Sequence, residues 1–368
     1  MESEIEGRIK ALRKKIETVD GQILHLLNER AGVALEVGRA KSEGNIDLYD
    51  PQREEAILQR LKLENSGPFP QRAISSVFRE IISACRSLET ELTVAYLGPA
   101  ATFTHMACIQ RFGSSVRALP QESIREVFEA AERGAAHYGV VPIENSTEGA
   151  VNQTLDLFIE YDVKICGEIL VRITHDLLSQ TGKPGDVREI YSHPQAFGQC
   201  RGWLMKNLPR IPQMTAASTA KAAEIAGRDG KAAAIASSFA ANLYGLKVIE
   251  SGIEDYRHNY TRFLILGKQN PQRTGTDKTS VLFSIPHTPG TLCQVLAIFS
   301  EKGINLTKIE SRPMKGKPWE YVFYVDFEGH AADAHVNEAI TEVKKTVLFM
   351  EILGSYPVSS GQCAGERE

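Results

Sequence analysis

The stretch YGVVPIENSTEGAVNQTLDLF, from Tyr138 to Phe158, is the most informative part of this chain. Its apolar run from Tyr138 to Val141 predicts a buried parallel strand, and the polar residues after it lead to a helix expected to begin near Glu148. Free backbone N–H groups at a helix N-terminus attract negative charge, and the stretch contains no Lys or Arg. It therefore predicts a pocket for a small carboxylate. The alternative is an ordinary polar turn between a strand and a helix.

Composition narrows the class of protein. A length of 368 residues suggests two or three domains, and a net charge of −4 argues against a nucleic-acid partner. The six cysteines include no C-x-x-C pair, which favours reduced thiols over disulfides or a zinc site. The charged N-terminus lacks the apolar core of a signal peptide, and no apolar run approaches the roughly 18 residues of a membrane span. We expect a cytoplasmic protein with no membrane partner, no metal and no cofactor.

Residues 1–91 are predicted to be all helical. Apolar residues recur at helical spacing without proline, so one helix is expected from about Glu4 to Ser42. Such a long helix suggests pairing with helices of a second chain. A second helix is expected from the cap Asp50 to near Asn65, and a third from about Gln71 to Thr90.

The rest of the chain alternates strands with helices. From Leu92 to about Lys268 the clearest strand candidates are TVAYL, YGVV, EIYS, AAAIA and FLIL, and their alternation with helices predicts parallel sheets. The polar segment KQNPQRTGTDKT reads as a linker. Residues 280–357 follow with the order strand, helix, strand, strand, helix, strand, which is a ferredoxin-like α+β arrangement. The predicted domains are therefore 1–91, 92–268 and 280–357.

Arg30 and Lys41 would lie on nearly the same face of the first helix, because eleven residues bring them to within about 20° of one another. The segments LRKKI, ERAGVALEVGRAK, YDPQREE and IISACRSLE occur in this order. Together they resemble the all-helical chorismate mutases. The resemblance implies a site made of Arg13 from a partner chain together with residues of the same chain: Arg30, Lys41, Asp50, Arg53, Glu54, Cys85 and Glu89.

The implied roles fit the reaction. A Claisen rearrangement requires a folded substrate and stabilisation of the charge on the breaking C–O bond, with no nucleophile. The resemblance makes the arginines hold carboxylates, Glu54 the ring hydroxyl, and Asp50 with Cys85 the wall. Lys41 and Glu89 would be catalytic at the ether oxygen. Burial would favour a protonated Glu89 and the nearby cations its ionised form, so the sequence leaves the direction of its pKa shift open.

Five motifs of the middle segment resemble prephenate dehydratases: LGPAATFTHMA, PIENST, YSHPQAFGQC, AASTAKAAE and NYTRFLIL. The family fold has two α/β lobes around a cleft, similar to solute-binding proteins. The resemblance makes Thr261 the catalytic hydrogen-bond donor to the leaving oxygen. The implied substrate-binding residues are Thr102, Asn145, Ser146, Thr147, Gln195, Ser218, Thr219, Arg262 and Phe263. Arg262 or the hydroxyl loops could bind the spectator carboxylate, and His105 and His193 are either acids or residues that order loops.

The last segment carries the motifs PGTL and IESRP, which resemble the phenylalanine-binding motifs of ACT regulatory domains. The residues implied are Pro289, Gly290, Thr291, Leu292, Glu310, Ser311, Arg312 and Pro313. Thr291 stands where alanine is common. The alternative is a dimerisation module that has lost its ligand.

The three resemblances together imply a bifunctional chorismate mutase–prephenate dehydratase of phenylalanine synthesis, both an isomerase and a lyase. Its small-molecule partners would be chorismate, prephenate and the effector phenylalanine, and it would form a homodimer or homotetramer. One rival keeps only the dehydratase, with the N-terminal helices serving dimerisation. Another is a solute-binding or sensory module without turnover, and a third prefers arogenate as substrate.

Overall fold

The computed structural model describes residues 2–44, 51–314 and 320–359. The chain divides into two compact units. The first consists of Met1–Leu92 and Phe112–Arg117, and the second of Thr93–Arg111 and Ala118–Glu368.

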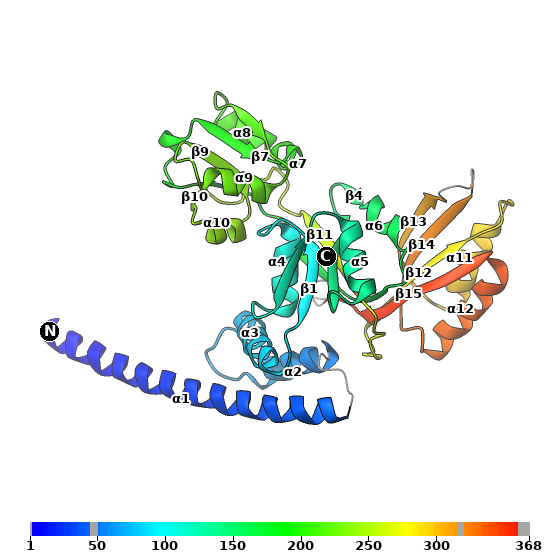
Figure 1. Ribbon diagram of the computed structural model, residues 1–368, viewed down its shortest axis with the longest axis horizontal. Coiled ribbons are helices and arrows are strands. Elements are labelled where there is room, and N and C mark those ends of the chain that lie inside the picture. The colour runs from blue at the N-terminus through cyan, green and yellow to red at the C-terminus, as the bar shows by residue number, and fades with distance from the viewer. Residues whose placement is uncertain (1, 45–50, 315–319, 360–368) are drawn as a thin grey trace. The chain divides into compact units, whose positions relative to one another are not determined.

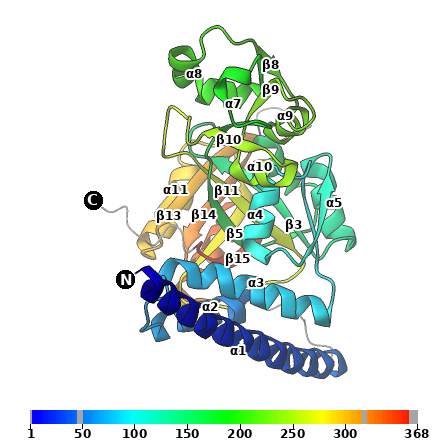
Figure 2. The same cartoon turned by 90° about the vertical axis from the view of Figure 1, so that its left-hand side faces the viewer.

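The first unit is helical, as predicted. Its helices are α1 (Glu2–Glu43), α2 (Pro51–Glu64) and α3 (Gln71–Glu89), and both α1 and α2 pack against α3 (Figure 1). Much of α1 has no cover within the chain, because its apolar side chains Ile5 and Ile16 are 58% and 60% exposed. Figure 2 shows α1 running past α2 and α3 in dark blue. Asp50, the predicted cap of α2, lies outside the described residues.

The second unit begins with a mixed sheet in the order β2-β1-β3-β11-β5, with β4 paired to β3. Its strands are β1 (Thr93–Leu97), β2 (Arg117–Gln121), β3 (Tyr138–Asn145), β4 (Gly149–Ala150), β5 (Lys164–Arg172) and β11 (Tyr260–Gly267). The helices of this lobe are α4 (Phe103–Phe112), α5 (Ile124–Arg133) and α6 (Asn152–Leu157).

A second lobe is built on a sheet in the order β10-β6-β9-β7-β8. Its strands are β6 (Asp176–Ser179), β7 (Glu189–Ser192), β8 (Gln213–Thr215), β9 (Ala232–Ala236) and β10 (Lys247–Glu250). Its helices are the 3-10 turn Pro184–Asp186, α7 (Pro194–Gln199), α8 (Arg201–Asn207), α9 (Thr219–Ala226) and α10 (Ser238–Tyr244). The chain enters this lobe after β5 and returns before β11, so two crossing segments join the lobes (Figure 1).

The prediction of parallel sheets is only partly correct. Strand β3 runs parallel to β1, and β7 runs parallel to β8 and β9. However, β11 is antiparallel to both of its neighbours, β3 and β5, and β6 is antiparallel to β9. The returning chain inserts β11 between β3 and β5 without a covering helix of its own, and such a strand is free to take the antiparallel sense.

The helix expected near Glu148 is also wrong. Strand β3 continues to Asn145, a turn follows, and β4 pairs back onto β3 before α6 begins at Asn152. The side-chain oxygen of Asn145 accepts hydrogen bonds from the backbone N–H groups of Thr147 and Glu148, and Gly149 takes the left-handed conformation that completes the turn. The stretch therefore forms a hairpin, and the predicted anion pocket at a helix N-terminus is absent from it.

The C-terminal part of the second unit has the predicted ferredoxin-like order. It comprises β12 (Asp277–Ser284), α11 (Thr291–Glu301), β13 (Leu306–Pro313), β14 (Tyr321–Glu328), α12 (Ala334–Thr346) and β15 (Phe349–Pro357). The antiparallel sheet runs β13-β14-β12-β15, and β15 packs against β5 of the first lobe. Leu282, Tyr324 and Tyr356 of this domain belong to the same hydrophobic core as Phe158 and Leu264 of that lobe.

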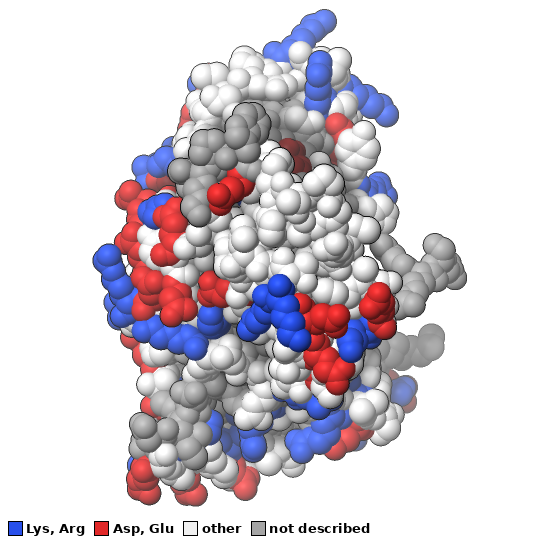
Figure 3. Space-filling view, turned by 90° about the vertical axis from the view of Figure 1, so that its right-hand side faces the viewer, with Lys and Arg blue, Asp and Glu red and all other residues white. Residues whose placement is uncertain are grey.

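The surface carries both signs of charge. Figure 3 shows acidic and basic side chains interspersed on one face, in keeping with the small net charge. Among the described residues, no helix is long and apolar enough to cross a bilayer. The cytoplasmic location stays a prediction.

Candidate active sites

The C-terminal half of α1 and the end of α3 bring together the ionisable side chains predicted for the helical segment. A Cβ atom placed on Gly38 would lie 2.9 Å from Cγ of Glu89, so only glycine allows this close approach. Burial raises the pKa of the Glu89 carboxyl above its ordinary value, while Lys41, Arg86 and Arg30 act in the opposite direction. Desolvation is the largest of these causes, so the pKa of Glu89 is raised. The sequence alone left the direction of this shift open.

Arg86 is a residue that the sequence reasoning missed. Its side chain is 6% exposed, its Nη1 lies 2.5 Å from Oε1 of Glu54, and its Nη2 donates to the carbonyl oxygen of Phe112 at 2.7 Å. The ion pair ties α2 to α3 and places a cation beside the carboxylate that was expected to hold a ring hydroxyl. The sequence signal that could have identified Arg86 is its position directly after the predicted Cys85.

The remaining residues predicted for this site are distributed unevenly. Cys85 is buried on α3, whereas Arg53 is exposed on α2. Arg13 is exposed on α1, about 25 Å along the helix axis from Arg30 at 1.5 Å per residue. One chain therefore does not bring Arg13 to the others.

A cavity of about 420 Å³ lies between the two lobes of the second unit. Loops from both sheets line it, at the ends of β1, β3, β7 and β11 among others. It includes most of the residues predicted for the dehydratase segment: Thr102, Asn145, Gln195, Ser218, Thr219, Thr261 and Phe263. No Lys or Arg is among the described residues that line it.

Thr261 is held in place by Asn145. It lies on β11 between Asn145 of β3 and Val171 of β5. Nδ2 of Asn145 donates to Oγ1 of Thr261 at 2.8 Å. Because Oγ1 accepts this hydrogen bond, the hydroxyl proton of Thr261 remains available to a guest in the cavity.

Ser146 and Thr147 shape the loop instead of lining this cavity. Oγ of Ser146 accepts from the backbone N–H of Tyr260 at 2.9 Å and also lies 3.3 Å from the carbonyl oxygen of His258. Oγ1 of Thr147 donates to Oδ1 of Asn145 at 2.6 Å. Both hydroxyls therefore have partners within the protein.

Arg262 does not face the cavity, which corrects its predicted role as a ligand of the spectator carboxylate. Its guanidinium bonds Glu168 at 2.7 Å, Asp326 at 2.6 Å and the hydroxyl of Tyr356 at 3.0 Å, and its side chain is 8% exposed. Side chains alternate between the two faces of a strand, so Thr261 and Arg262 point to opposite sides. Arg262 belongs to a buried ion-pair network with the C-terminal domain.

The two histidines considered as acids both order loops. Nδ1 of His105 accepts from the backbone N–H of Ala101 at 3.1 Å, its ring stacks on Tyr96, and burial lowers its pKa. Nδ1 of His193 accepts from the backbone N–H of Gln195 at 3.3 Å at the start of α7. These contacts favour the loop-ordering alternative.

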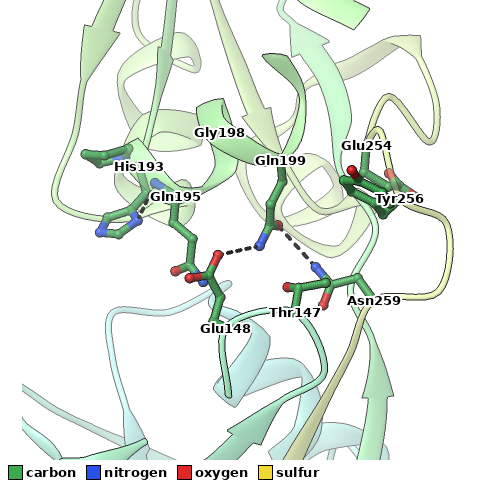
Figure 4. A pocket seen from close by; sticks show the side chains of 10 residues that line it. Thr147, Glu148, His193, Gln195, Gly198, Gln199, Glu254, Tyr256 and Asn259 are labelled. Carbon is green, nitrogen blue, oxygen red and sulfur yellow. Dashed lines mark hydrogen bonds between the residues drawn. The ribbon is translucent and has the colours of Figure 1, made fainter. Parts of the chain in front are cut away.

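A second cavity, of about 600 Å³, adjoins the first and shares His193, Gln195 and Gln199 with it. Figure 4 shows Gln199 of α7 between Glu148 and Asn259, with hydrogen bonds to both. Because Glu148 follows β3 and Gln199 belongs to the other lobe, this glutamine links the two sides of the cleft.

The predicted effector residues lie at the start of α11 and along β13. Gly290 precedes α11, and β13 is an edge strand whose residues alternate between exposed and partly buried. Ser311 lies on the exposed face, whereas Arg312 pairs with Asp156 of α6 at 3.0 Å. No cluster of candidate metal ligands occurs within residues 2–44, 51–314 and 320–359.

The chain matches three family models: Chorismate mutase type II over residues 12–90, Prephenate dehydratase over 94–271, and ACT domain over 279–345. The bifunctional chorismate mutase/prephenate dehydratase of Aquifex aeolicus is 49% identical over 353 residues, covering 95% of this chain and 98% of that protein. The protein of the same description from Pseudomonas aeruginosa is 42% identical over 358 residues, covering 96% and 98%. The crystal structure of prephenate dehydratase in complex with L-Phe from Arthrobacter aurescens is 34% identical with a TM-score of 0.67, covering 72% of this chain and 90% of its own.

Proposed function

The chain belongs to the bifunctional chorismate mutase/prephenate dehydratase family, and from that premise we propose which of its residues perform each step. The protein rearranges chorismate to prephenate and then removes CO2 and water from prephenate to form phenylpyruvate, within phenylalanine biosynthesis. It carries an ACT domain, which fits control by a small molecule.

For the mutase, Arg30, Arg53 and a partner chain's Arg13 hold the two carboxylates of chorismate. Lys41 and the protonated carboxyl of Glu89 donate hydrogen bonds to the ether oxygen, which gains negative charge as its bond to carbon breaks. A carboxylic acid donates only while it keeps its proton, and burial of Glu89 favours that form. Arg86 orients Glu54 through their ion pair.

For the dehydratase, the single observation that carries the proposal is the hydrogen bond from Asn145 to Thr261 in the cavity between the lobes. It directs the hydroxyl proton of Thr261 away from Asn145 and toward the leaving oxygen of prephenate. A threonine hydroxyl is too weak an acid to transfer its proton at neutral pH, so it acts as a preorganised hydrogen-bond donor. Aromatisation of the ring supplies the driving force.

The effector of the ACT domain is phenylalanine, as the ligand of the Arthrobacter aurescens structure suggests. Phenylalanine would bind near Gly290 and Ser311. On the same strand as Ser311, Lys308 pairs with Glu144 at 3.0 Å, and Glu144 precedes the Asn145 that holds Thr261. A shift of β13 on effector binding would thus reach the dehydratase loop through this ion pair. Such control requires that phenylalanine bind two states of the protein with different affinities.

The active assembly contains at least a dimer, with α1 packed on a second copy. Two observations support this: α1 exposes apolar side chains along most of its 42 residues, and Arg13 lies far from the rest of its site within one chain. Whether two dimers form a tetramer is decided by measuring the mass of the assembly in solution.

One incubation tests the proposal as a whole. The protein is given chorismate, and prephenate and phenylpyruvate are followed over time with and without phenylalanine. Both products should appear in sequence, and phenylalanine should slow the second step. Prephenate that accumulates without phenylpyruvate would contradict the dehydratase assignment, and a parallel incubation with arogenate measures the substrate preference.

A further inference from the structure

His175 is a buried residue of the dehydratase cavity with no role in the steps above. It lies just after β5, on the first segment that crosses between the lobes, and it lines the same 420 Å³ cavity as Thr261. The residue is 3% exposed, and its ring atom Nδ1 has no hydrogen-bond partner in the described structure. Buried polar atoms seldom lack a partner, so a guest in the cavity is the natural candidate.

Whether Nδ1 is a donor or an acceptor follows from a relay of hydrogen bonds that begins at the backbone. The N–H groups of Thr147 and Glu148 can only donate, so they identify the oxygen of the Asn145 amide. The nitrogen of Asn145 then donates to Oδ1 of Asn259 at 2.8 Å. The nitrogen of Asn259 donates in turn to Oε1 of Gln199 at 3.2 Å.

The relay ends on the imidazole. Nε2 of His175 lies 2.8 Å from Oε1 of Gln199. An amide oxygen only accepts, so Nε2 carries the ring proton. Burial lowers the pKa of His175, which favours the neutral ring. Nδ1 is therefore left with a lone pair and acts as an acceptor.

The other histidines near the cavity differ in this respect. Nδ1 of His105 accepts from the N–H of Ala101, and Nδ1 of His193 accepts from the N–H of Gln195. Among these three histidines, His175 alone offers an unused acceptor. The same amide of Asn145 that starts the relay also bonds Thr261, so one network prepares a donor and an acceptor in one cavity.

The chemistry of prephenate identifies the group that fits this pair. At neutral pH prephenate carries two ionised carboxylates, a keto group and one ring hydroxyl, and only the hydroxyl has a proton to donate. A hydroxyl also accepts hydrogen bonds, so it matches one acceptor and one donor together. We propose that Nδ1 of His175 accepts a hydrogen bond from the ring hydroxyl of prephenate and holds its oxygen toward the hydroxyl of Thr261.

The proposal rests on the dehydratase function and adds a substrate contact to it. In the reaction, the electron pair of the ring-to-carboxylate C–C bond moves into the ring as CO2 forms. The electron pair of the C–O bond leaves with the oxygen as hydroxide, which keeps its own proton on the side of His175 and accepts from Thr261. It takes a further proton from solvent to become water. His175 neither gains nor loses a proton overall.

Two substitutions distinguish the role of Nδ1 of His175 from that of Nε2. His175→Gln places a polar atom where Nε2 lies and removes the acceptor at Nδ1, whereas His175→Asn can present its carbonyl where Nδ1 lies. We expect kcat/KM for prephenate to fall by about tenfold or more in His175→Gln, the scale of one lost hydrogen bond, and by less in His175→Asn. Mutase activity of the same preparations reports on folding of the helical unit, and binding of phenylpyruvate reports on folding of the cavity.

Phenylpyruvate serves as the control ligand because it has no ring hydroxyl. Its affinity, measured as product inhibition, should stay within about twofold of wild type in His175→Gln. Near-normal turnover of prephenate by His175→Gln, or equal weakening of prephenate and phenylpyruvate binding, would overturn the inference. If wild type itself does not convert prephenate, the proposed function fails first, so the two failures are distinguishable.

A measurement without substitution at position 175 guards against misfolded variants. In Thr261→Val protein with 15N-labelled histidine, an unprotonated Nδ1 signal should shift on binding prephenate and remain in place on binding phenylpyruvate. A protonated Nδ1, or the same shift with both ligands, would contradict the assignment.

Discussion

The two catalytic regions solve different chemical problems with different side chains. The mutase region gathers ionisable groups, with Arg30 and Lys41 close enough to Glu89 to influence its pKa. The dehydratase cavity is lined instead mainly by hydroxyl, amide, imidazole and apolar side chains, with Glu122 as its acidic residue, and its described lining contains no Lys or Arg. The rearrangement creates charge on an ether oxygen that cations and acids can stabilise, whereas the elimination needs one leaving group held in a defined orientation.

The difference also shows in what local spacing along the sequence reveals about each site. Cations at helical spacing are visible in the order of residues, as Arg30 and Lys41 were. The proposed donor Thr261 is held by Asn145, which lies 116 residues away along the chain. The following predictions test whether the mutase region acts through its charged groups and the dehydratase cavity through the orientation of its hydrogen-bonding groups.

The largest effect is expected from removing a charge of the mutase region. Lys41→Met should lower mutase kcat by roughly 10²–10³-fold, the scale for a transition-state donor, and leave phenylpyruvate formation from prephenate unchanged. The matched control is Lys15→Met, an exposed lysine on the same helix. Undiminished mutase activity in Lys41→Met would show that Lys41 is not the donor to the ether oxygen.

Removing the hydroxyl of the dehydratase region should have the next largest effect. Thr261→Val keeps the shape of the side chain and should reduce the dehydratase rate by about a hundredfold, because the leaving oxygen loses its donor. Mutase activity should remain intact. The control is Thr215→Val, at an exposed position on β8. Near-normal phenylpyruvate formation by Thr261→Val would remove Thr261 from the mechanism.

A change of pH tests the protonated form of Glu89. Burial raises its pKa, so the donor form persists to higher pH than for an ordinary glutamate and is lost as pH rises through the raised pKa. Mutase kcat/KM should therefore fall on the alkaline side by up to about tenfold per pH unit. Glu89→Gln supplies a permanent donor and should flatten that side of the profile.

The informative measurement is mutase kcat/KM against pH for both proteins, with dehydratase kcat/KM as the internal reference. Superimposable mutase profiles would mean that Glu89 does not face the ether oxygen, or that it keeps its proton throughout the pH range of the measurement.

The smallest effect on turnover is expected in the regulatory domain. Ser311→Phe places a bulky side chain on the exposed face of β13 and should abolish inhibition by phenylalanine while uninhibited turnover stays within about twofold. Thr307→Phe, at an exposed position four residues earlier on β13, is the control. Inhibition of Ser311→Phe at the wild-type phenylalanine concentration would place the effector site elsewhere.

Local patterns predicted the helices and the ferredoxin-like domain well, because periodicity and capping are local signals. They failed where a distant partner intervened. The hairpin after Asn145 depends on β4 pairing back, and the antiparallel sense of β11 depends on the path of the chain through the other lobe. Arg262 was assigned to the substrate although strand alternation from Thr261 already placed it on the opposite face.

For the candidate sites, residue types were predictable and environments were not. The motifs made Thr261 and Glu89 candidates, but only burial gives the direction of the Glu89 pKa shift. Arg86 and His175 carried no pattern of their own. Their candidate roles follow only from contacts with residues distant in the sequence. Arg86 pairs with Glu54, and His175 bonds Gln199.

The buried network around Arg262 bears on how this enzyme can be engineered. Asp326 and Tyr356 bond Arg262 from the C-terminal domain, and Lys278 bonds Glu168 at 3.2 Å. Deleting that domain to obtain a feedback-resistant catalyst would strip these partners from buried charges, at a cost of several kcal/mol, and would expose the hydrophobic core that the two domains share. The C-terminal domain therefore cannot be removed without destabilising the dehydratase lobes. A variant that resists feedback inhibition is better sought by point substitution on β13 than by truncation.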